Sequence, residues 1–375
     1  MDVQDRVRGC LLGGAIGDAL GAPIEFQSLR EIRRDHGVDG ITGYVTTWRG
    51  KTGLITDDTQ MTLFTVEGLI RARADHGNEP GTDWTGGALG AVREAYLRWL
   101  DTQDHHAPPL ADLPHRTGRL REEAWLYSRR APGNACLSGL HHPFPGPAPL
   151  GEPGPVNPNS KGCGTVMRSA PFGLLPTPTT ELRGEGAVTA TGPEGEGSAA
   201  GPEGEGAARE AFGLSVACAQ ITHGHPTGYL AAGAFAAIIA HLMAGEPLDS
   251  AVHLTLDLLA SCPAHDETTA ALRAAVALAA DGEPTPERVE SLGGAWIAEE
   301  ALAIGVYCAL AESSVEDALL LSVNHSGDSD STGSVCGNLL GALHGADALP
   351  ARWLRPLEGR DTIERLAAEL AGERT

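Results

Sequence analysis

Apolar residues recur at helical spacing along most of this chain, and the alternation typical of strands is nearly absent. In 57–75, for example, Met61, Phe64 and Ile70 follow an approximate helical period, with acids in the first turn and arginines near the end. The same reasoning predicts helices at 6–21, 85–101, 208–221, 226–244, 249–261, 267–281, 286–291, 297–312, 315–322, 331–344 and 361–371, with a helical piece near 118–130. No solenoid period appears, so we predict an all-α fold forming a single globular multi-helix domain over 1–375.

The segment 6–21, RVRGCLLGGAIGDALG, is rich in small residues and is interrupted by one acid, Asp18. Glycine lowers helix propensity, so its repeated use here needs another reason. We expect this helix to be buried, with its glycines allowing close approach of a second helix.

The segment 176–209 differs from the rest of the chain. It contains GPEGEG twice, at 192–197 and 201–206, within a tract of Pro, Thr, Glu, Gly and Ala. Such a composition offers little apolar surface to offset the entropy of ordering. We predict a disordered surface insertion between two helices.

Composition narrows the class of protein. Hydrophobic residues make up 42% of the chain, enough for a core, and the formal net charge is −22, a field that disfavours binding to nucleic acid but attracts divalent cations. The seven cysteines are widely spaced without a CxxC pair, which indicates reduced thiols in a cytoplasmic protein. We find neither a signal peptide nor an apolar run long enough for a membrane span, and expect no membrane partner.

Two short acidic runs carry the clearest chemistry. Thr56, Asp57 and Asp58 open one predicted helix, and the second run, Asp328 to Thr332, opens another. A helix cap explains one acceptor in each run, but not four carboxylates and several hydroxyls. These hard oxygen ligands suit Mg²⁺, Mn²⁺ or Ca²⁺. If the two runs meet in the fold, they form a site for two metal ions.

Two further motifs are weaker on their own. The run Ser160 to Arg168 is glycine-rich and is either a tight turn or a backbone cradle for phosphate or ribose oxygens; it matches neither a P-loop nor GxGxxG. His223 and His225 form a His-x-His pair, which resembles a zinc ligand pair but lacks further Cys or His partners at suitable spacing.

Together these motifs resemble the ADP-ribosylglycohydrolase family. The resemblance rests on segments in family order, namely RVRGCLLGGAIGDALGAPIEF at 6–26, GLITDDTQMTL at 53–63, NSKGCGTVMRSAPFGLL at 159–175, THGHP at 222–226, AEEALAIGVYCAL at 298–310 and NHSGDSDSTGSVCGNLLGALHG at 324–345. It covers most of the chain apart from 176–209 and parts of 102–155. It implies an all-α fold with a binuclear Mg²⁺ or Mn²⁺ centre in a cleft.

The resemblance also assigns residues. It implies metal ligands at Thr56, Asp57, Asp58, Asp328, Asp330 and Ser331, where some members have threonine in place of the serine. Glu25 matches a glutamate that positions water or substrate, and Asp58 and Asp330 are candidates for proton transfer, so these three are the predicted catalytic residues. The predicted substrate-binding residues are Gly162, Cys163, Gly164, Thr165, Met167 and Arg168, in the loop that wraps ADP-ribose, and His223 near the adenosine side. Many members have asparagine where Cys163 stands, which affects the ribose and phosphate contacts.

The implied activity is hydrolysis of the bond between ADP-ribose and an acceptor, aided by two divalent cations. ADP-ribosyl-arginine is the first expected substrate, because the Asp-Ser-Asp-Ser form resembles arginine-specific members; serine-linked and small-molecule conjugates are alternatives. A non-catalytic ADP-ribose-binding or structural relative is a further alternative, disfavoured because all six metal-ligand positions are retained. An isoprenoid synthase is also all-α with acidic motifs, but its DDxxD is not met at Asp57.

Overall fold

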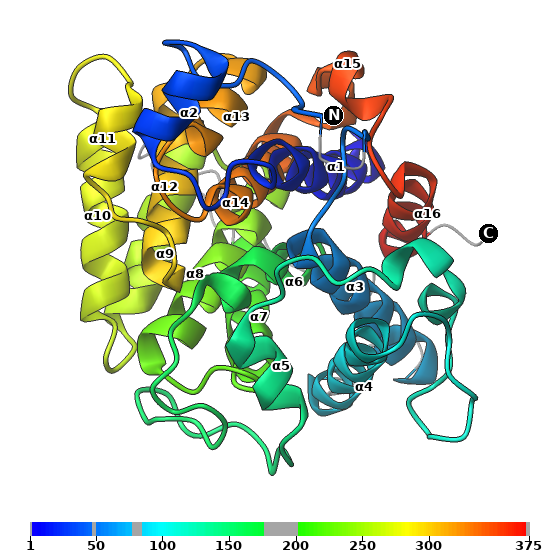
Figure 1. The fold of residues 1–375 in the computed structure, drawn as a ribbon. Coiled ribbons are helices and arrows are strands. Elements are labelled where there is room, and N and C mark those ends of the chain that lie inside the picture. Colours follow the sequence, from blue (N-terminus) through cyan, green and yellow to red (C-terminus); the bar gives the residue numbers. More distant parts are fainter. Residues whose placement is uncertain (1, 47–49, 77–84, 176–201, 373–375) are drawn as a thin grey trace.

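The computed structural model describes residues 2–46, 50–76, 85–175 and 202–372 (Figure 1). Within these ranges the chain is helical, and an isolated bridge between Gly162 and Ile297 is the one β-type pairing. The α-helices are α1 (Val3–Gly21), α2 (Leu29–His36), α3 (Asp57–His76), α4 (Thr85–Asp104), α5 (Asn134–Leu140), α6 (Ala170–Gly173), α7 (Pro202–Ala219), α8 (Pro226–Met243), α9 (Leu248–Ala260), α10 (Asp266–Ala279), α11 (Pro286–Glu290), α12 (Ala298–Ala311), α13 (Val315–Val323), α14 (Ser329–His344), α15 (Ala351–Leu354) and α16 (Arg360–Ala371). Short 3₁₀ turns are η1 (Leu120–Glu122), η2 (Ala124–Leu126), η3 (Cys163–Arg168) and η4 (Ala346–Ala348). The predicted all-α fold is confirmed.

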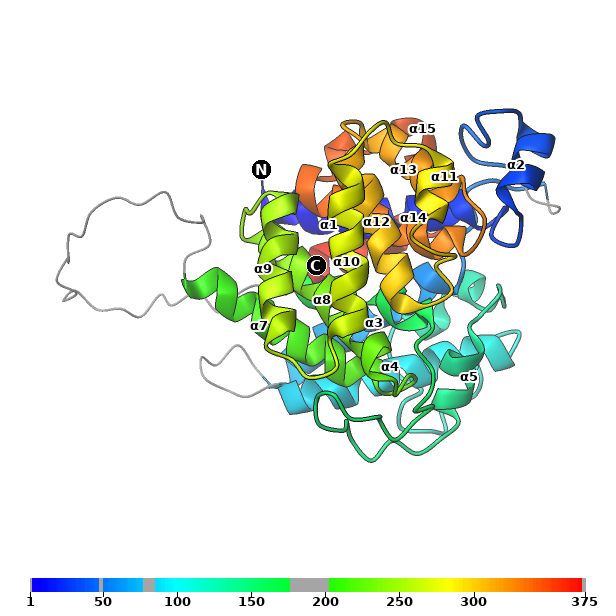
Figure 2. The ribbon, with the colours of Figure 1, turned by 90° about the vertical axis from the view of Figure 1, so that its left-hand side faces the viewer.

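Helices α1 and α14 lie side by side and antiparallel through the middle of the molecule (Figures 1 and 2). Glycines of the two helices face each other at successive turns, so closely that a Cβ on Gly17 would lie 1.8 Å from the carbonyl oxygen of Gly333 and one on Gly13 would lie 2.2 Å from that of Gly337. The expected close packing of the glycine-rich segment is thereby confirmed. It brings the end of α1 to the start of α14, where the second acidic run lies.

Helix α3 starts next to this pair. Asp18 of α1 is fully buried and accepts hydrogen bonds from the backbone N–H groups of Thr56, at 3.0 Å, and Thr59, at 3.1 Å. The Thr59 hydroxyl donates to the same carboxylate at 2.5 Å. A side chain of α1 therefore caps α3, which places the first acidic run against the central helix pair.

The remaining helices complete the core around α8. Among the described residues α8 alone has the length and apolar composition of a membrane span, yet 89% of that stretch is buried by its neighbours. Helix α7 packs along it, and α9, α10 and α12 stand beside it in Figure 2. The structure thus uses α8 as a core helix.

Some local predictions differ from the structure. Most of the predicted insertion, 176–201, lies outside the described residues, whereas Pro202–Arg209 is already part of α7. The prediction of disorder was therefore wrong for 202–209, where Ala208 is buried and starts a buried helical face that continues at Ala211. Helix α2 was not predicted; a capping box between Ser28 and Glu31 begins it.

Candidate metal and ADP-ribose site

The first acidic run lies at the N-terminus of α3. The side chains of Asp57 and Asp58 stand in its first turn and are each 3% exposed, and Thr56 precedes them. The backbone N–H of Asp58 donates to Thr56 Oγ1 at 3.3 Å, and the N–H of Gly133 donates to Asp57 Oδ2 at 3.4 Å. Both aspartates are thus presented by a helix start that is fixed by neighbouring segments.

The second acidic run lies at the N-terminus of α14. Asp328 is the N-cap residue, and Asp330 and Ser331 stand in the first turn, all buried. Gly327 before them has φ +130°, and a Cβ there would lie 2.2 Å from the Gly294 carbonyl oxygen, so the turn into this run requires glycine.

The two runs meet. Ser331 Oγ donates a hydrogen bond of 2.9 Å to Asp58 Oδ2. This bond joins α14 to α3, whose first residues are 272 positions apart in the sequence. Carboxylate oxygens of Glu25, Asp328 and Asp330 all lie within 4.8 Å of one another. Predicted metal ligands from both runs and the predicted catalytic Glu25 therefore share one buried cluster.

This cluster is electrostatically unfavourable without a cation. Burial and the nearby charges of Asp330 and Asp328 raise the pKa of Glu25 to about 10. Burial and the charge of Asp330 raise the pKa of Asp57 and of Asp58 well above the ordinary range. Lys161 pairs with Glu267 and Glu299 instead, and among the described residues no arginine forms an ion pair with these carboxylates. Buried oxygens with unmatched negative charge fit divalent cations of the Mg²⁺ or Mn²⁺ type.

The glycine-rich loop reaches this cluster through Cys163. Its thiol donates to Asp328 Oδ2 at 2.7 Å, and its backbone N–H donates to the carbonyl oxygen of Trp296 at 3.2 Å. A Cβ on Gly164 would lie 2.7 Å from Cys136 Sγ and 3.1 Å from the His223 ring, so this position has no room for a larger side chain. The backbone of the predicted ADP-ribose loop therefore runs directly beside the second acidic run.

Other predicted substrate-binding side chains point into the protein. Thr165 Oγ1 donates to the Gly228 carbonyl oxygen at 2.8 Å, and Met167 is 2% exposed. The Arg168 guanidinium is buried over the Tyr96 ring, 4.4 Å from its centroid. Their part in substrate binding stays a prediction. Because their side chains are buried, these residues can contact a substrate only through the loop backbone, or can act by supporting the loop.

His223 is buried behind the loop. Its Nδ1 lies 2.8 Å from Thr222 Oγ1, and burial followed by the nearby charge of Arg168 lowers its pKa to about 3. A neutral buried imidazole packed against Gly164 supports the loop. Contact with adenosine stays a prediction.

Sequence reasoning missed three features of the site. The first is Asp18, whose carboxylate caps the first acidic run from α1. Its position as the single acid within an apolar, glycine-rich helix was the feature of the sequence that could have indicated this role. Phe26 and Trp296 stack with ring centroids 5.7 Å apart, 72% and 47% exposed, and nothing in the sequence links them.

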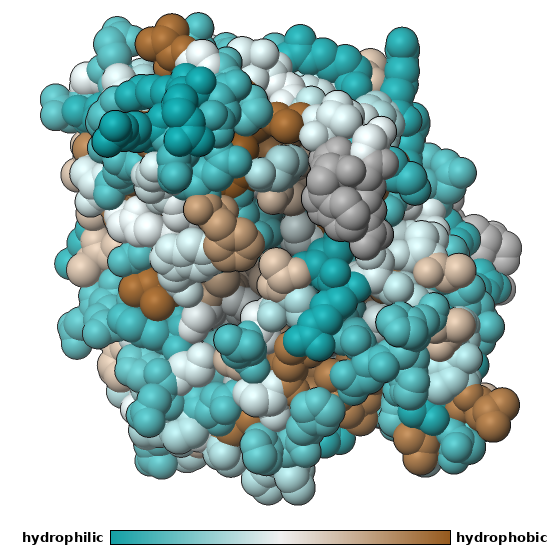
Figure 3. Space-filling model, viewed as in Figure 1, coloured by the Kyte–Doolittle hydropathy of each residue, from teal (hydrophilic) through white to brown (hydrophobic). Residues whose placement is uncertain are grey.

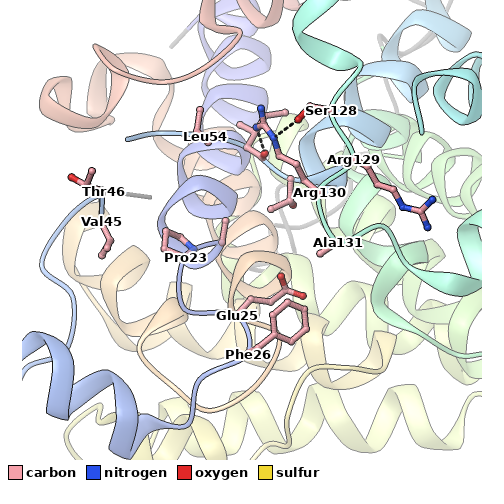
Figure 4. Close-up of a pocket in the computed structure, with 13 residues that line it drawn as sticks. Pro23, Glu25, Phe26, Val45, Thr46, Leu54, Ser128, Arg129, Arg130 and Ala131 are labelled. Atoms are coloured by element: carbon pink, nitrogen blue, oxygen red, sulfur yellow. Dashed lines mark hydrogen bonds between the residues drawn. The ribbon is translucent and has the colours of Figure 1, made fainter. Parts of the chain in front are cut away.

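The third missed feature is a cavity of about 410 Å³ beside Glu25, bounded also by Thr56 and by 128–131 (Figure 4). The surface of this side of the molecule is largely hydrophilic, with apolar residues in several separate patches (Figure 3).

The chain is similar to known proteins over nearly its whole length. The chain is 26% identical over 368 residues to ADP-ribosyl-[dinitrogen reductase] glycohydrolase of Rhodospirillum rubrum, covering 95% of this chain and 91% of that relative. It is 23% identical to ADP-ribosylarginine hydrolase Tri1 of Pseudomonas putida, covering 98% of this chain and 78% of that protein. A solved ADP-ribosylglycohydrolase-related protein complex shares the fold with a TM-score of 0.59 and 24% identity, over 98% of both chains.

The family match extends over the entire sequence. The description "ADP-ribosylglycohydrolase" fits residues 1–375, which include both acidic runs, the glycine-rich loop and Glu25. From its sequence, its fold and the meeting of these motifs, the chain belongs to the ADP-ribosylglycohydrolase family.

Proposed function

We propose that this protein is a metal-dependent hydrolase that releases ADP-ribose from ADP-ribosylated substrates, with ADP-ribosyl-arginine as the first candidate. Family membership and the distant relatives support the hydrolase activity. The observation that carries the proposal is the buried cluster in which Glu25, Asp328 and Asp330 converge and Ser331 contacts Asp58.

In this proposal two Mg²⁺ or Mn²⁺ ions are held by Thr56, Asp57, Asp58, Asp328, Asp330 and Ser331. When bound, such ions supply Lewis-acid stabilisation of charge and orient ribose hydroxyls. The fit rests on the donor set, which consists of hard oxygen atoms from buried side chains.

The chain's own groups provide the proton transfer. In this proposal a carboxylate of Glu25, Asp58 or Asp330 takes the proton of the attacking water, which is supported by their shared position in the buried cluster. The water oxygen bonds to the anomeric carbon as the bond to the acceptor breaks, and the acceptor leaves with a proton. In this proposal the loop beside Asp328 holds the ribose and phosphates with the N–H groups of Gly162 and Gly164, since the Cys163 N–H already donates to the Trp296 carbonyl oxygen.

Arginine as the acceptor is supported by the name of the Pseudomonas relative and by the Asp-Ser-Asp-Ser run. Serine-linked and small-molecule ADP-ribose conjugates use the same cluster and are the second candidates. The proposal includes a cytoplasmic location, for which the support is that all seven cysteines are free.

The test is release of ADP-ribose from arginine-ADP-ribosylated protein, before and after EDTA, and with Mg²⁺ or Mn²⁺ restored. We expect metal-dependent release that is abolished in Asp57→Ala and Asp330→Ala while the helical circular dichroism is retained. The same assay with serine-ADP-ribosylated protein shows which of the two linkages the protein cleaves. Full activity in either variant, or after EDTA, would contradict the two-metal proposal. Binding of ADP-ribose without release from any linkage would identify a non-catalytic relative.

A further inference from the structure

We propose that the cavity beside Glu25 is the acceptor subsite. In this inference it takes the modified side chain of an ADP-ribosylated protein, and Arg129 at its rim pairs with an acidic residue that flanks the modified one. The inference rests on the proposed function, because it assigns the partner of the same reaction.

The cavity is continuous with the candidate metal centre. Glu25 and Thr56 both form part of its wall, and its volume of about 410 Å³ lies in the range of small-molecule sites. None of the residues of the 159–168 loop or of 222–226 lines it. If ADP-ribose lies along that loop, the group on the other side of the cleaved bond needs a separate space next to Glu25, and this cavity provides it.

The inner wall suits a side chain with an aliphatic stem. Phe26 and Ile55 supply apolar surface, and Phe26 is 72% exposed although it directly follows the buried Glu25. An exposed aromatic residue beside a reactive centre can cover the stem of an incoming side chain.

The two arginines of the wall differ in their partners. Arg130 donates to both carboxylate oxygens of Glu358, one of them at 2.8 Å, and to the Ile55 carbonyl oxygen, so its charge is matched. Arg129 is exposed and has no ionic partner among the residues that the structure describes. Figure 4 shows its side chain extending away from that of Arg130.

The unpaired positive charge of Arg129 determines which residues of a protein partner are favoured at the rim of the cavity. The whole chain carries a formal net charge of −22, so a protein partner with basic residues would find favourable surface almost anywhere on it. At the cavity rim, however, Arg129 favours a carboxylate and disfavours a basic residue. The outward-pointing guanidinium of Arg129 would contact the residues that flank the ADP-ribosylated residue, while Glu25 would face the modified side chain itself.

The experiment compares two ADP-ribosylated peptides that share one modified arginine and differ in acidic or basic flanking residues. Initial rates of ADP-ribose release are measured with Mg²⁺ for the wild type, for Arg129→Glu and for the matched control Arg273→Glu, an exposed arginine on α10. Binding of free ADP-ribose is measured by calorimetry for all three.

We expect Arg129→Glu to raise KM for the acid-flanked peptide roughly five- to tenfold, to lower it for the base-flanked peptide, and to leave kcat nearly unchanged. The affinity for free ADP-ribose and all values for Arg273→Glu should match the wild type.

Equal KM values in Arg129→Glu and Arg273→Glu, with an active wild type, would overturn the inference alone. Loss of free ADP-ribose binding in Arg129→Glu would also overturn it, because the arginine would then contact the nucleotide. A wild type that releases no ADP-ribose from either peptide would overturn arginine as the proposed linkage, and this inference with it.

Discussion

Ser331 Oγ lies 2.9 Å from Asp58 Oδ2 and donates a hydrogen bond to it. This contact links the first turn of α14 to the first turn of α3, and both residues are buried. A hydroxyl that binds a carboxylate of the other run fixes the relative position of the two halves of the candidate metal site.

We therefore expect Ser331→Ala to weaken Mn²⁺ affinity roughly 10- to 100-fold, as for the loss of a ligand or of a group that orients one. Ser331→Thr keeps the hydroxyl and should stay within a few-fold of the wild type. Calorimetric Mn²⁺ titration of the three proteins measures this directly. Wild-type affinity in the alanine variant would mean that the hydroxyl has no role at the site.

Asp18 holds the first run in place from α1. Asp18→Ala removes the acceptor of the Thr56 and Thr59 N–H groups and should cost about 1–2 kcal/mol in the free energy of unfolding, as for a lost N-cap. It should also lower Mn²⁺ affinity about tenfold, because the first turn of α3 is no longer fixed.

A matched control for Asp18→Ala is Thr65→Val, which removes a buried hydroxyl of α3 that contacts Tyr96, away from the first turn. It should lower stability in urea unfolding without changing Mn²⁺ affinity. If Asp18→Ala behaves in the same way as this control, Asp18 serves stability alone.

Close packing of α1 on α14 should tolerate no side chain at Gly17. A Cβ there would lie 1.8 Å from the Gly333 carbonyl oxygen, so Gly17→Ala must separate the helices and should destabilise the protein by roughly 1–3 kcal/mol. The separation should also reduce Mn²⁺ affinity, since α14 carries the second run.

Gly213→Ala on α7 provides the control, because a Cβ there meets nothing within 4 Å. Better helix propensity should make that variant about 0.5–1 kcal/mol more stable in the same urea unfolding experiment. Equal stability of Gly17→Ala and the wild type would show that the helices can move apart without cost.

His223 should make the fold sensitive to acid. Its pKa is lowered by burial to about 3, below the ordinary value of 6.5, so above pH 6.5 it is neutral in both the folded and unfolded chains. As the pH falls from 6.5 towards 3, the unfolded chain binds a proton that the folded chain does not, and stability is lost.

His223→Gln removes this proton uptake, so its stability should fall less than that of the wild type between pH 7 and pH 4, by roughly 2–3 kcal/mol. Urea unfolding at several pH values measures the difference, with exposed His253→Gln as the control. Parallel pH profiles of His223→Gln and the wild type would contradict the buried neutral state.

The sequence by itself determined the helical class and most helix positions, because the apolar period and the Gly and Pro positions are local signals. The helix predicted at 57–75 is observed as Asp57–His76, and the one predicted at 226–244 as Pro226–Met243. Local signals also marked both acidic runs as a candidate metal site, since they contain more carboxylates and hydroxyls than two helix caps need. They misjudged 202–209, where packing of α7 outweighs a glycine-rich composition.

Only the tertiary structure decided how these pieces act together. The distance between Ser331 and Asp58, the capping of α3 by Asp18, and the inward orientation of Arg168 depend on contacts between residues far apart in the chain. The cavity beside Glu25 with Arg129 at its rim likewise joins segments that no local pattern connects. Such contacts follow from how helices pack, and the facing glycines of α1 and α14 allow these two helices to approach so closely that neither could carry a side chain there.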